Sequence, residues 1–159
     1  IKQSFSVMNG ETPRIIDPRN AFIMTSLLKE VINTGTARKA KRLKREDIAG
    51  KTGTTNELVD AWFAGFTPNV VTITWMGFDQ PRSLGKHESG SRAALPIWID
   101  YMKPLINDYP TRIEETPEGI IPLRINPKNG MLANKDEDSI YEYFYDEFPP
   151  SNNAYFLLN

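Results

Sequence analysis

The chain has 159 residues, of which 40% are hydrophobic, and this is enough for one domain with a substantial core. Its formal net charge of −1 excludes a global field that would draw the whole molecule to nucleic acid or to an anionic membrane. The absence of cysteine excludes disulfides and thiolate metal sites. No apolar run approaches the roughly twenty residues of a membrane span. Because the chain begins at Ile1, we expect it to be a piece of a longer protein.

The first element expected along the chain is an amphipathic helix over residues 18–34. Asp17 and Pro18 are typical of a helix start, because a carboxylate caps free N–H groups and proline at the first helical position loses no hydrogen bond. Apolar residues then recur at helical spacing, and Gly35 supplies a stop signal.

The basic segment RKAKRLKR at residues 38–45 has two readings. It favours a solvated loop or hairpin with Leu43 turned inward. A basic cluster can also hold nucleic acid or lipid headgroups, but no aromatic residues interleave this one and the rest of the chain is not basic. We therefore expect no nucleic-acid partner.

Three strands are expected next, at residues 47–54, 60–67 and 70–78. In the third strand, Val, Ile and Trp alternate with Thr, Thr and Met, as in a sheet with two different faces. Pro68-Asn69 is typical of a turn, so the second and third strands form an antiparallel hairpin.

The remainder divides into a loop, a helix and a tail. Residues 79–92 are polar, and apolar residues at three-four spacing then predict a second amphipathic helix to about residue 106. Pro96 and Pro104 predict a kink or an early end of that helix. Further on we expect a short strand, a turn at Asn126–Gly130, another short strand and an acidic, aromatic tail without clear periodicity.

The stretch GKTGTTNE at residues 50–57 carries the candidate chemistry. It is not a phosphate-binding loop, because Arg45 stands where that motif needs glycine and because Lys-Thr-Gly here enters a strand rather than a helix. Strand alternation places Thr52 and Thr54 on one face, where two hydroxyls and a nearby ammonium suit a ligand carboxylate. A free N–H of Thr54 would serve as half of an oxyanion hole, and a glycine in the strand lets another backbone lie flat against it.

Together with DAWFAGFTP at 60–68 and ITWMGFD at 73–79, this stretch resembles the C-terminal part of the transpeptidase domain of class A, bifunctional penicillin-binding proteins. The segments 17–37 and 88–106 resemble the helices that flank the Lys-Thr-Gly strand in that family. The resemblance implies an α+β fold, an antiparallel five-stranded sheet flanked by helices, as in serine β-lactamases. Residues 1–108 would be the C-terminal part of the transpeptidase domain, and residues 109–159 an extension or tail.

The resemblance also implies a reaction, in which a serine attacks the D-alanyl-D-alanine end of a peptidoglycan stem peptide and the acyl-enzyme then cross-links a second stem. β-Lactams acylate the same serine. By motif, Lys51 and Thr54 are the catalytic residues, and Thr52, Gly53, Thr54 and Thr55 bind substrate. The implied partners are stem peptides, β-lactam antibiotics and the N-terminal remainder of the protein. The implied location is the extracytoplasmic face of the bacterial inner membrane, with the anchor outside this chain.

The nucleophile of that reaction is expected to lie outside this chain. Ser26–Lys29 fits Ser-x-x-Lys, but it matches the later helix of the family and stands too close to Lys51. Ser151–Asn153 fits Ser-x-Asn, but it follows Lys-Thr-Gly where it should precede it. We treat both as coincidental and expect the chain alone to be inactive, since no acyl-enzyme forms without a nucleophile.

Three alternatives stay open: a fragment of a serine β-lactamase, a fragment of a DD-carboxypeptidase, and a non-catalytic interaction module of the same fold. No cofactor and no metal are expected, and His87, the only histidine, is expected at the surface. Trp62, Phe63 and Phe66 are expected in the sheet core, with Trp62 near enough to the motif to border a cleft.

Overall fold

The computed structural model describes residues 15–151. The described residues form two compact units, one made of residues 23–116 and the other of residues 15–22 with 117–151. We call the first the sheet body and the second the hairpin unit. Within the described range no helix combines the length and the hydropathy that crossing a membrane requires.

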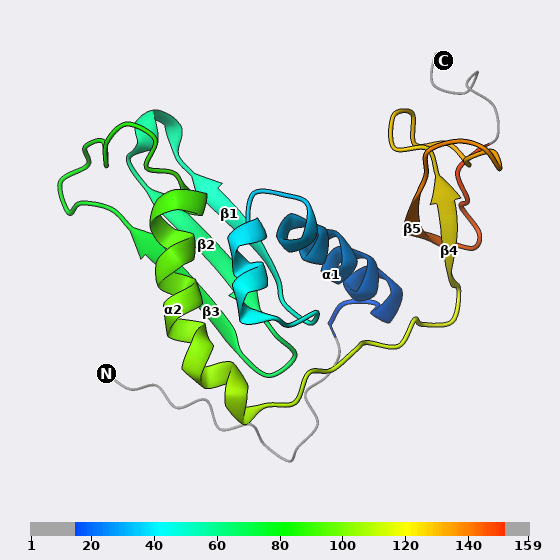
Figure 1. Cartoon of the computed structure of the whole chain (residues 1–159), viewed down its shortest axis with the longest axis horizontal. Coiled ribbons are helices and arrows are strands. Elements are labelled where there is room, and N and C mark those ends of the chain that lie inside the picture. Colours follow the sequence, from blue (N-terminus) through cyan, green and yellow to red (C-terminus); the bar gives the residue numbers. More distant parts are fainter. Residues whose placement is uncertain (1–14, 152–159) are drawn as a thin grey trace. The chain divides into compact units, whose positions relative to one another are not determined.

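The sheet body contains a three-stranded antiparallel sheet in the order β1-β2-β3, with β1 at Ala49–Thr54, β2 at Ala61–Phe66 and β3 at Val71–Met76 (Figure 1). The register pairs Thr52 with Phe63 and Trp62 with Trp75. The predicted hairpin of β2 and β3 is confirmed, and in its turn the Thr67 N–H donates to the Val70 carbonyl at 2.9 Å. Each predicted strand is real but is shorter than the sequence suggested.

One face of this sheet carries the core of the body. Helix α2 (Leu95–Leu105) crosses it and places Trp98 edge-on against Phe63, with ring centroids 4.9 Å apart and both side chains fully buried (Figure 1). Gly65 makes room for this contact, since a Cβ there would lie 2.6 Å from the Phe63 ring and 2.7 Å from Trp98. The indole N–H of Trp98 donates to the Thr72 carbonyl at 3.0 Å, so the buried ring leaves no polar atom unpaired.

The opposite face of the sheet is different. Trp62, Ile73 and Trp75 point to it and are 41%, 62% and 46% exposed. The expectation that Trp62 belongs to the core is therefore wrong, because strand alternation turns it away from Phe63, which is buried as expected. A face this apolar is unusual on a free-standing sheet.

Helix α1 spans Pro18–Asn33, as the sequence predicted. The carboxylate of Asp17 accepts a hydrogen bond from the Arg19 N–H at 2.9 Å, which is the expected cap. The basic segment after the helix is neither loop nor hairpin: Arg38–Leu43 forms a 3-10 helix that buries Ala40 and packs Leu43 against the core. Small and apolar residues three apart give this basic turn, as we call Arg38–Leu43, an inner side.

Helix α2 begins and ends close to its prolines. A π-turn at Gly90–Ala94 leads into it, so the polar loop ends earlier than predicted. Pro96 lies in the first turn, where its missing N–H costs nothing, and Pro104 is followed by the last helical residue. The helix therefore covers almost the whole range that its apolar spacing predicted, and the two prolines do not shorten it.

A buried ion pair lies between the start of β1 and the end of α2. The guanidinium of Arg45 binds both carboxylate oxygens of Asp47, at 2.8 and 2.6 Å, and donates to the carbonyls of Ile106, Tyr109 and Pro110. The side chains of Arg45 and Asp47 are only 8% and 1% exposed. All donors of the guanidinium are therefore used, and the segment after α2 is fastened to the start of β1.

The hairpin unit pairs β4 (Ile120–Ile125) with β5 (Ile140–Tyr145) in antiparallel register. The predicted turn at Asn126–Gly130 is present, but the strand expected after it is a single bridge between Ile125 and Leu132. The true partner, β5, lies in the stretch that the sequence indicated as an aperiodic tail. That reading was wrong because aromatic and apolar side chains occur on both faces of β5, which removes the alternation.

Candidate active site

The predicted site residues lie on β1, which has a strand partner on one side only within the described chain. The Thr55 N–H donates to the Asp60 carbonyl at 3.1 Å, so the antiparallel alternation makes the pair of Thr54 and Ala61 a non-hydrogen-bonded one. The N–H and C=O groups of Thr52 and Thr54 therefore point away from β2. The edge of the sheet offers these groups to a ligand.

The hydroxyls of Thr52 and Thr54 lie on one face, as predicted, and each meets a different segment of the body. Thr52 Oγ1 is 2.7 Å from Thr36 Oγ1, just after α1. Thr54 Oγ1 accepts a hydrogen bond from the Gly90 N–H at 3.0 Å, just before α2. Two distant parts of the sequence thus frame the free edge of β1.

Gly90 can lie this close to β1 only because it has no side chain. A Cβ at this position would stand 2.4 Å from the carbonyl oxygens of both Gly53 and Trp62. Any other residue would push the start of α2 away from the strand and release the Thr54 hydroxyl. Gly90 was not predicted as a site residue.

Lys51 is exposed, and its ammonium donates to the Thr52 carbonyl at 2.9 Å. That carbonyl is one of the groups that point outward, so the positive charge lies along the free edge. Gly53 carries no side chain beside Trp62, whose Cβ would be 3.2 Å from a Cβ at Gly53. Lys51, Thr52, Gly53 and Thr54 are therefore together at one edge.

Thr55 differs from the other predicted residues. Its hydroxyl accepts the Asp60 N–H at 2.8 Å and so closes the loop between β1 and β2. Its role in substrate binding stays a prediction.

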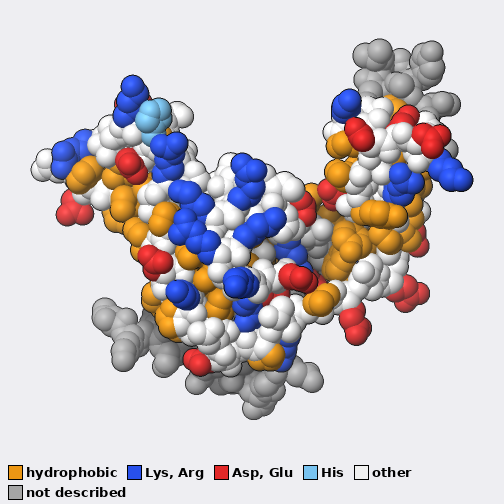
Figure 2. Space-filling view, in the orientation of Figure 1, with side chains coloured by type: hydrophobic (Ala, Val, Ile, Leu, Met, Phe, Trp, Pro, Cys, Tyr) orange, Lys and Arg blue, Asp and Glu red, His pale blue; other side chains and the backbone are white. Residues whose placement is uncertain are grey.

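Next to the edge lies a groove of about 490 Å³. We call it the cationic groove; it is lined by Gly35, Thr36, Arg38, Lys39, Glu88, Ser91 and Arg92. Figure 2 shows Lys and Arg side chains gathered across this side of the sheet body. Hydroxyls, outward N–H groups and ammonium or guanidinium groups all favour an anionic ligand, above all a carboxylate. The same outward N–H groups suit an oxygen that gains negative charge during acyl transfer.

The coincidental Ser-x-x-Lys match is not at this edge. Ser26 lies in the middle of α1, and no hydrogen bond of the described residues joins Ser26 or Lys29 to β1. The triplet Ser151–Asn153 falls partly outside the described residues. His87 is exposed, as predicted. Within residues 15–151 no cluster of His, Cys, Asp or Glu side chains is arranged to hold a metal ion.

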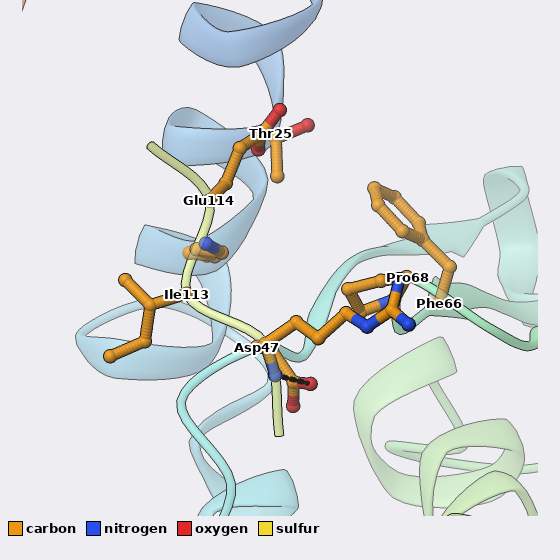
Figure 3. Close-up of a pocket in the computed structure, with 8 residues that line it drawn as sticks. Thr25, Asp47, Phe66, Pro68, Ile113 and Glu114 are labelled. Carbon is orange, nitrogen blue, oxygen red and sulfur yellow. Dashed lines mark hydrogen bonds between the residues drawn. The ribbon is translucent and has the colours of Figure 1, made fainter. Parts of the chain in front are cut away.

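A second pocket, of about 330 Å³, contains none of the predicted site residues. Figure 3 shows it between α1 and the segment that follows α2, with the Asp47 carboxylate hydrogen-bonded to the main-chain N–H of Arg112 at 3.1 Å. Phe66 and Pro68 form one wall and Ile113 another. We relate this pocket to the fastening of residues 109–112 rather than to catalysis, because its one buried charged group is already satisfied.

Sequence reasoning missed Thr36, Gly90 and the residues of the cationic groove. Thr36 follows a helix stop, and Gly90 lies between two serines before a helix, so both carried local signals of a turn. Neither signal indicates that the turn contacts β1, because that contact depends on the tertiary structure.

Comparison with known proteins finds relatives that share one name, penicillin-binding protein 1A. The chain is 51% identical over 142 residues to penicillin-binding protein 1A of Pseudomonas aeruginosa, and the match covers 88% of this chain and 17% of that protein. It is 47% identical over 115 residues to penicillin-binding protein 1A of Neisseria lactamica, covering 72% of this chain and 14% of that protein. The chain therefore spans less than a fifth of the length of each of these two relatives. No family model matches it.

The fold agrees with this match. The crystal structure of penicillin-binding protein 1A from Haemophilus influenzae superimposes with a TM-score of 0.80 and 38% sequence identity, covering 87% of this chain and 22% of that one. The α+β fold expected from the resemblance is therefore confirmed for a portion of that fold: of the five antiparallel strands expected, the sheet of the described residues has three, with helices packed on it.

Proposed function

Because this chain is homologous to a segment of penicillin-binding protein 1A, we propose that it supplies the Lys-Thr-Gly wall of the cleft of a serine-type peptidoglycan DD-transpeptidase. The observation that carries the proposal is the free edge of β1, where Lys51, the outward N–H of Thr54 and two framed hydroxyls lie together. Residues 1–108 would belong to the transpeptidase domain and residues 109–159 to its extension.

The roles follow from the groups at the edge. The stem peptide lies along β1 as an added strand, and its terminal carboxylate accepts hydrogen bonds from the hydroxyls of Thr52 and Thr54. The Thr54 N–H points at the oxygen of the scissile carbonyl and stabilises its negative charge when the serine attacks. Lys51 adds positive charge and takes part in proton transfer. Gly53 has no side chain that would block the strand edge. The Thr55 hydroxyl closes the turn after the strand by accepting the Asp60 N–H.

The covalent step needs a serine from the rest of the protein. Its oxygen bonds to the carbonyl carbon, the C–N bond to the terminal D-alanine breaks, and the leaving amine takes up the serine proton. An amine of a second stem peptide then attacks the ester, which forms the cross-link and returns the proton to the serine oxygen. A β-lactam would acylate the same serine oxygen; the C–N bond that breaks is part of its ring, so the leaving amine takes up the proton but stays attached to the acyl group.

The exposed face of the sheet is consistent with a partner from the same protein. Ile73, Trp75 and Val71 expose apolar surface beside the edge of β3, where a further strand would bury it. We propose that the N-terminal remainder, carrying Ser-x-x-Lys and Ser-x-Asn, occupies this surface, and that the assembled enzyme works at the extracytoplasmic face of the inner membrane. This segment alone would then be inactive.

The test is acylation of the complete protein by fluorescent penicillin, with and without Lys51→Ala. We expect the variant to acylate at least a hundredfold more slowly, since loss of a group acting in general acid-base catalysis typically costs this much. Lys41→Ala, on the basic turn and outside the groove, is the matched control and should acylate like the wild type. Unchanged acylation of Lys51→Ala contradicts the assigned role.

The open alternatives give different products. A β-lactamase would release the hydrolysed antibiotic, and a DD-carboxypeptidase would release D-alanine without joining two stems. A wild-type protein that penicillin does not label would instead favour the non-catalytic interaction module.

A further inference from the structure

The two edges of the β4–β5 ribbon differ in the groups that they present. The Asp146 N–H donates to the Gly119 carbonyl at 3.1 Å, which makes these two residues a hydrogen-bonded pair. Because the alternation continues along the ribbon, the N–H and C=O groups of every second residue point away from the partner strand. On β4 these outward residues are Ile120, Pro122 and Arg124, and on β5 they are Tyr141, Tyr143 and Tyr145.

The edge of β4 is closed to a further strand. Pro122 has no N–H at its outward position, and the Arg124 carbonyl accepts the Ala133 N–H at 2.9 Å. Next to it, the Asn126 N–H donates to the Met131 carbonyl at 2.8 Å, so the segment after the turn covers this end of the strand. Proline and a covering segment are two means by which proteins prevent strands from adding to an edge.

The edge of β5 is open. The Tyr145 carbonyl accepts the Phe148 N–H at 3.0 Å. No main-chain hydrogen bond within residues 15–151 uses the outward N–H groups of the three tyrosines or the carbonyls of Tyr141 and Tyr143. The side chains of Ile140 and Tyr141 are 43% and 70% exposed. An added strand would therefore find both main-chain partners and apolar surface at this edge.

The charge around β5 decides which kind of strand fits. Residues 136–147 contain six carboxylates and no lysine or arginine. Asp136 and Asp138 form no ion pair with a described residue. The carboxylates also crowd one another, since the hydrogen bond and the charge of Glu147 raise the pKa of Asp146. Figure 2 shows acidic side chains around the apolar surface of this unit, so the open edge carries an excess of negative charge.

We propose that the β5 edge is a docking site for an extended basic segment of a partner protein, which adds to the ribbon as a third strand. The outward N–H and C=O groups of β5 pair with its main chain, and its lysine or arginine side chains meet the carboxylates on and beside β5. A second copy of this chain does not fit, because pairing β5 with itself would bring carboxylates beside carboxylates. This site belongs to the hairpin unit and does not depend on the proposed catalytic role of β1.

The experiment measures binding of a synthetic probe to the complete protein by fluorescence anisotropy. The probe is a labelled peptide as long as β5, in which lysine alternates with valine. The same peptide with glutamate in place of lysine should bind about tenfold more weakly, which is what a few exposed charge pairs contribute. Added NaCl should weaken the lysine peptide, because exposed charges are screened. N-methylation of every residue keeps the charge but removes the main-chain donors, and should also weaken binding about tenfold.

Hydrogen exchange locates the binding site. The outward N–H groups of β5 lack a partner within the described residues and should exchange quickly in the free protein. The lysine peptide should slow the exchange of Tyr141, Tyr143 and Tyr145, and should leave β2 unchanged.

Tyr141→Pro tests the edge itself. The Tyr141 N–H points outward, so proline removes it without breaking the β4–β5 ladder, as Pro122 does on the other strand. This variant should bind the lysine peptide about tenfold more weakly. Tyr141→Ala, the matched control, keeps the N–H and loses only the ring, so it should bind about threefold more weakly or less.

A second variant tests the charge and serves if Tyr141→Pro fails to fold, as thermal melting would report. Asp136→Asn with Asp138→Asn should weaken binding of the lysine peptide about threefold. Asp100→Asn with Asp108→Asn removes two exposed carboxylates of the sheet body and should leave binding unchanged.

Four results would overturn the proposal. The first is a lysine peptide that does not bind, and the second is a glutamate peptide that binds equally well. The third is a β5 edge that is already protected from exchange in the complete protein without peptide, because another part of the same protein then occupies it. The fourth is self-association of the wild type that Tyr141→Pro abolishes, since the occupant would then be a second copy.

Discussion

The sheet body and the hairpin unit are each stabilised by a different kind of internal contact. The body closes around fully buried side chains, of which Trp98 and Phe63 are the largest. In the hairpin unit the buried apolar side chains are Phe22, Ile120 and Ile125, each with a small exposed fraction. Individual contacts surround them: the buried Phe22 ring meets the half-buried Tyr143 ring edge-on at 4.9 Å, and at the surface Arg19 binds Glu147 at 2.7 Å.

The stability of the sheet body therefore depends on buried volume, whereas that of the hairpin unit depends on individual contacts. A two-stranded ribbon is marginal in water without packing against something else, and here the start of α1 supplies that packing. Losing one core side chain should therefore affect the body strongly, whereas losing one surface contact should affect the hairpin unit alone. Hydrogen exchange of the complete protein, read by peptide, measures both units in one experiment.

The largest effect is expected for Trp98→Ala. The change removes a fully buried indole and leaves a cavity above Phe63, which should lower the local stability of the body by about 4 kcal/mol. The measurement is hydrogen exchange in peptides from β2 and α2. Ile97→Ala, at the neighbouring residue with 45% exposure, is the matched control and should cost well under half as much. Equal effects would mean that the body is not organised by this core.

A smaller effect is expected for Asp47→Asn. It leaves the Arg45 guanidinium buried without its counter-ion and should destabilise the body by about 3 kcal/mol. The same peptides report the change. Asp17→Asn removes an exposed carboxylate but keeps a good helix cap, so this control should change little. If the two variants behave alike, the buried pair adds no stability.

The buried pair also predicts a pH dependence. Burial by itself raises the pKa of Asp47, but the hydrogen bonds from Arg45 and from the Arg112 N–H outweigh it and hold this pKa below its ordinary value. A carboxyl whose pKa is lowered on folding stabilises the fold above its unfolded pKa of about 4, and loses this contribution as the pH falls through the folded pKa. Asp47→Asn should abolish this part of the acid sensitivity.

The smallest effect is expected for Arg19→Gln. Its hydrogen bond lowers the pKa of Glu147 to about 2, so the contact should persist until the pH falls to that value. Because both side chains are partly exposed, the change should increase hydrogen exchange in β5 and leave β2 unchanged. Added salt should imitate it in part. An equal response in β2 would show that the two units unfold together.

Much of the body could be predicted from the sequence because its local signals agree with its fold. Asp17 and Pro18 begin a real helix, and the alternation from Val71 to Met76 marks a real strand. The motif at Lys51–Thr54 was found because it is contiguous. What could not be predicted is the frame around it, since Thr36 and Gly90 meet β1 only in three dimensions.

The hairpin unit was harder for a physical reason. β5 has apolar and aromatic side chains on both faces, so neither a period of two nor a helical period stands out. The basic turn was missed for a related reason, because charged residues hide the small inner side formed by Ala40 and Leu43. In both places the burial pattern is set by neighbours distant in sequence.

The clamp formed by Arg45 has a consequence for anyone who shortens this protein. Its guanidinium closes the end of α2 from a position sixty residues upstream, by holding the carbonyls of Ile106, Tyr109 and Pro110. A version that stops at residue 108 would keep every helix and strand of the body. It would nevertheless leave the buried Arg45 guanidinium without two of its hydrogen-bond acceptors, the carbonyls of Tyr109 and Pro110. The natural cut lies after Arg112, whose N–H completes the shell of Asp47.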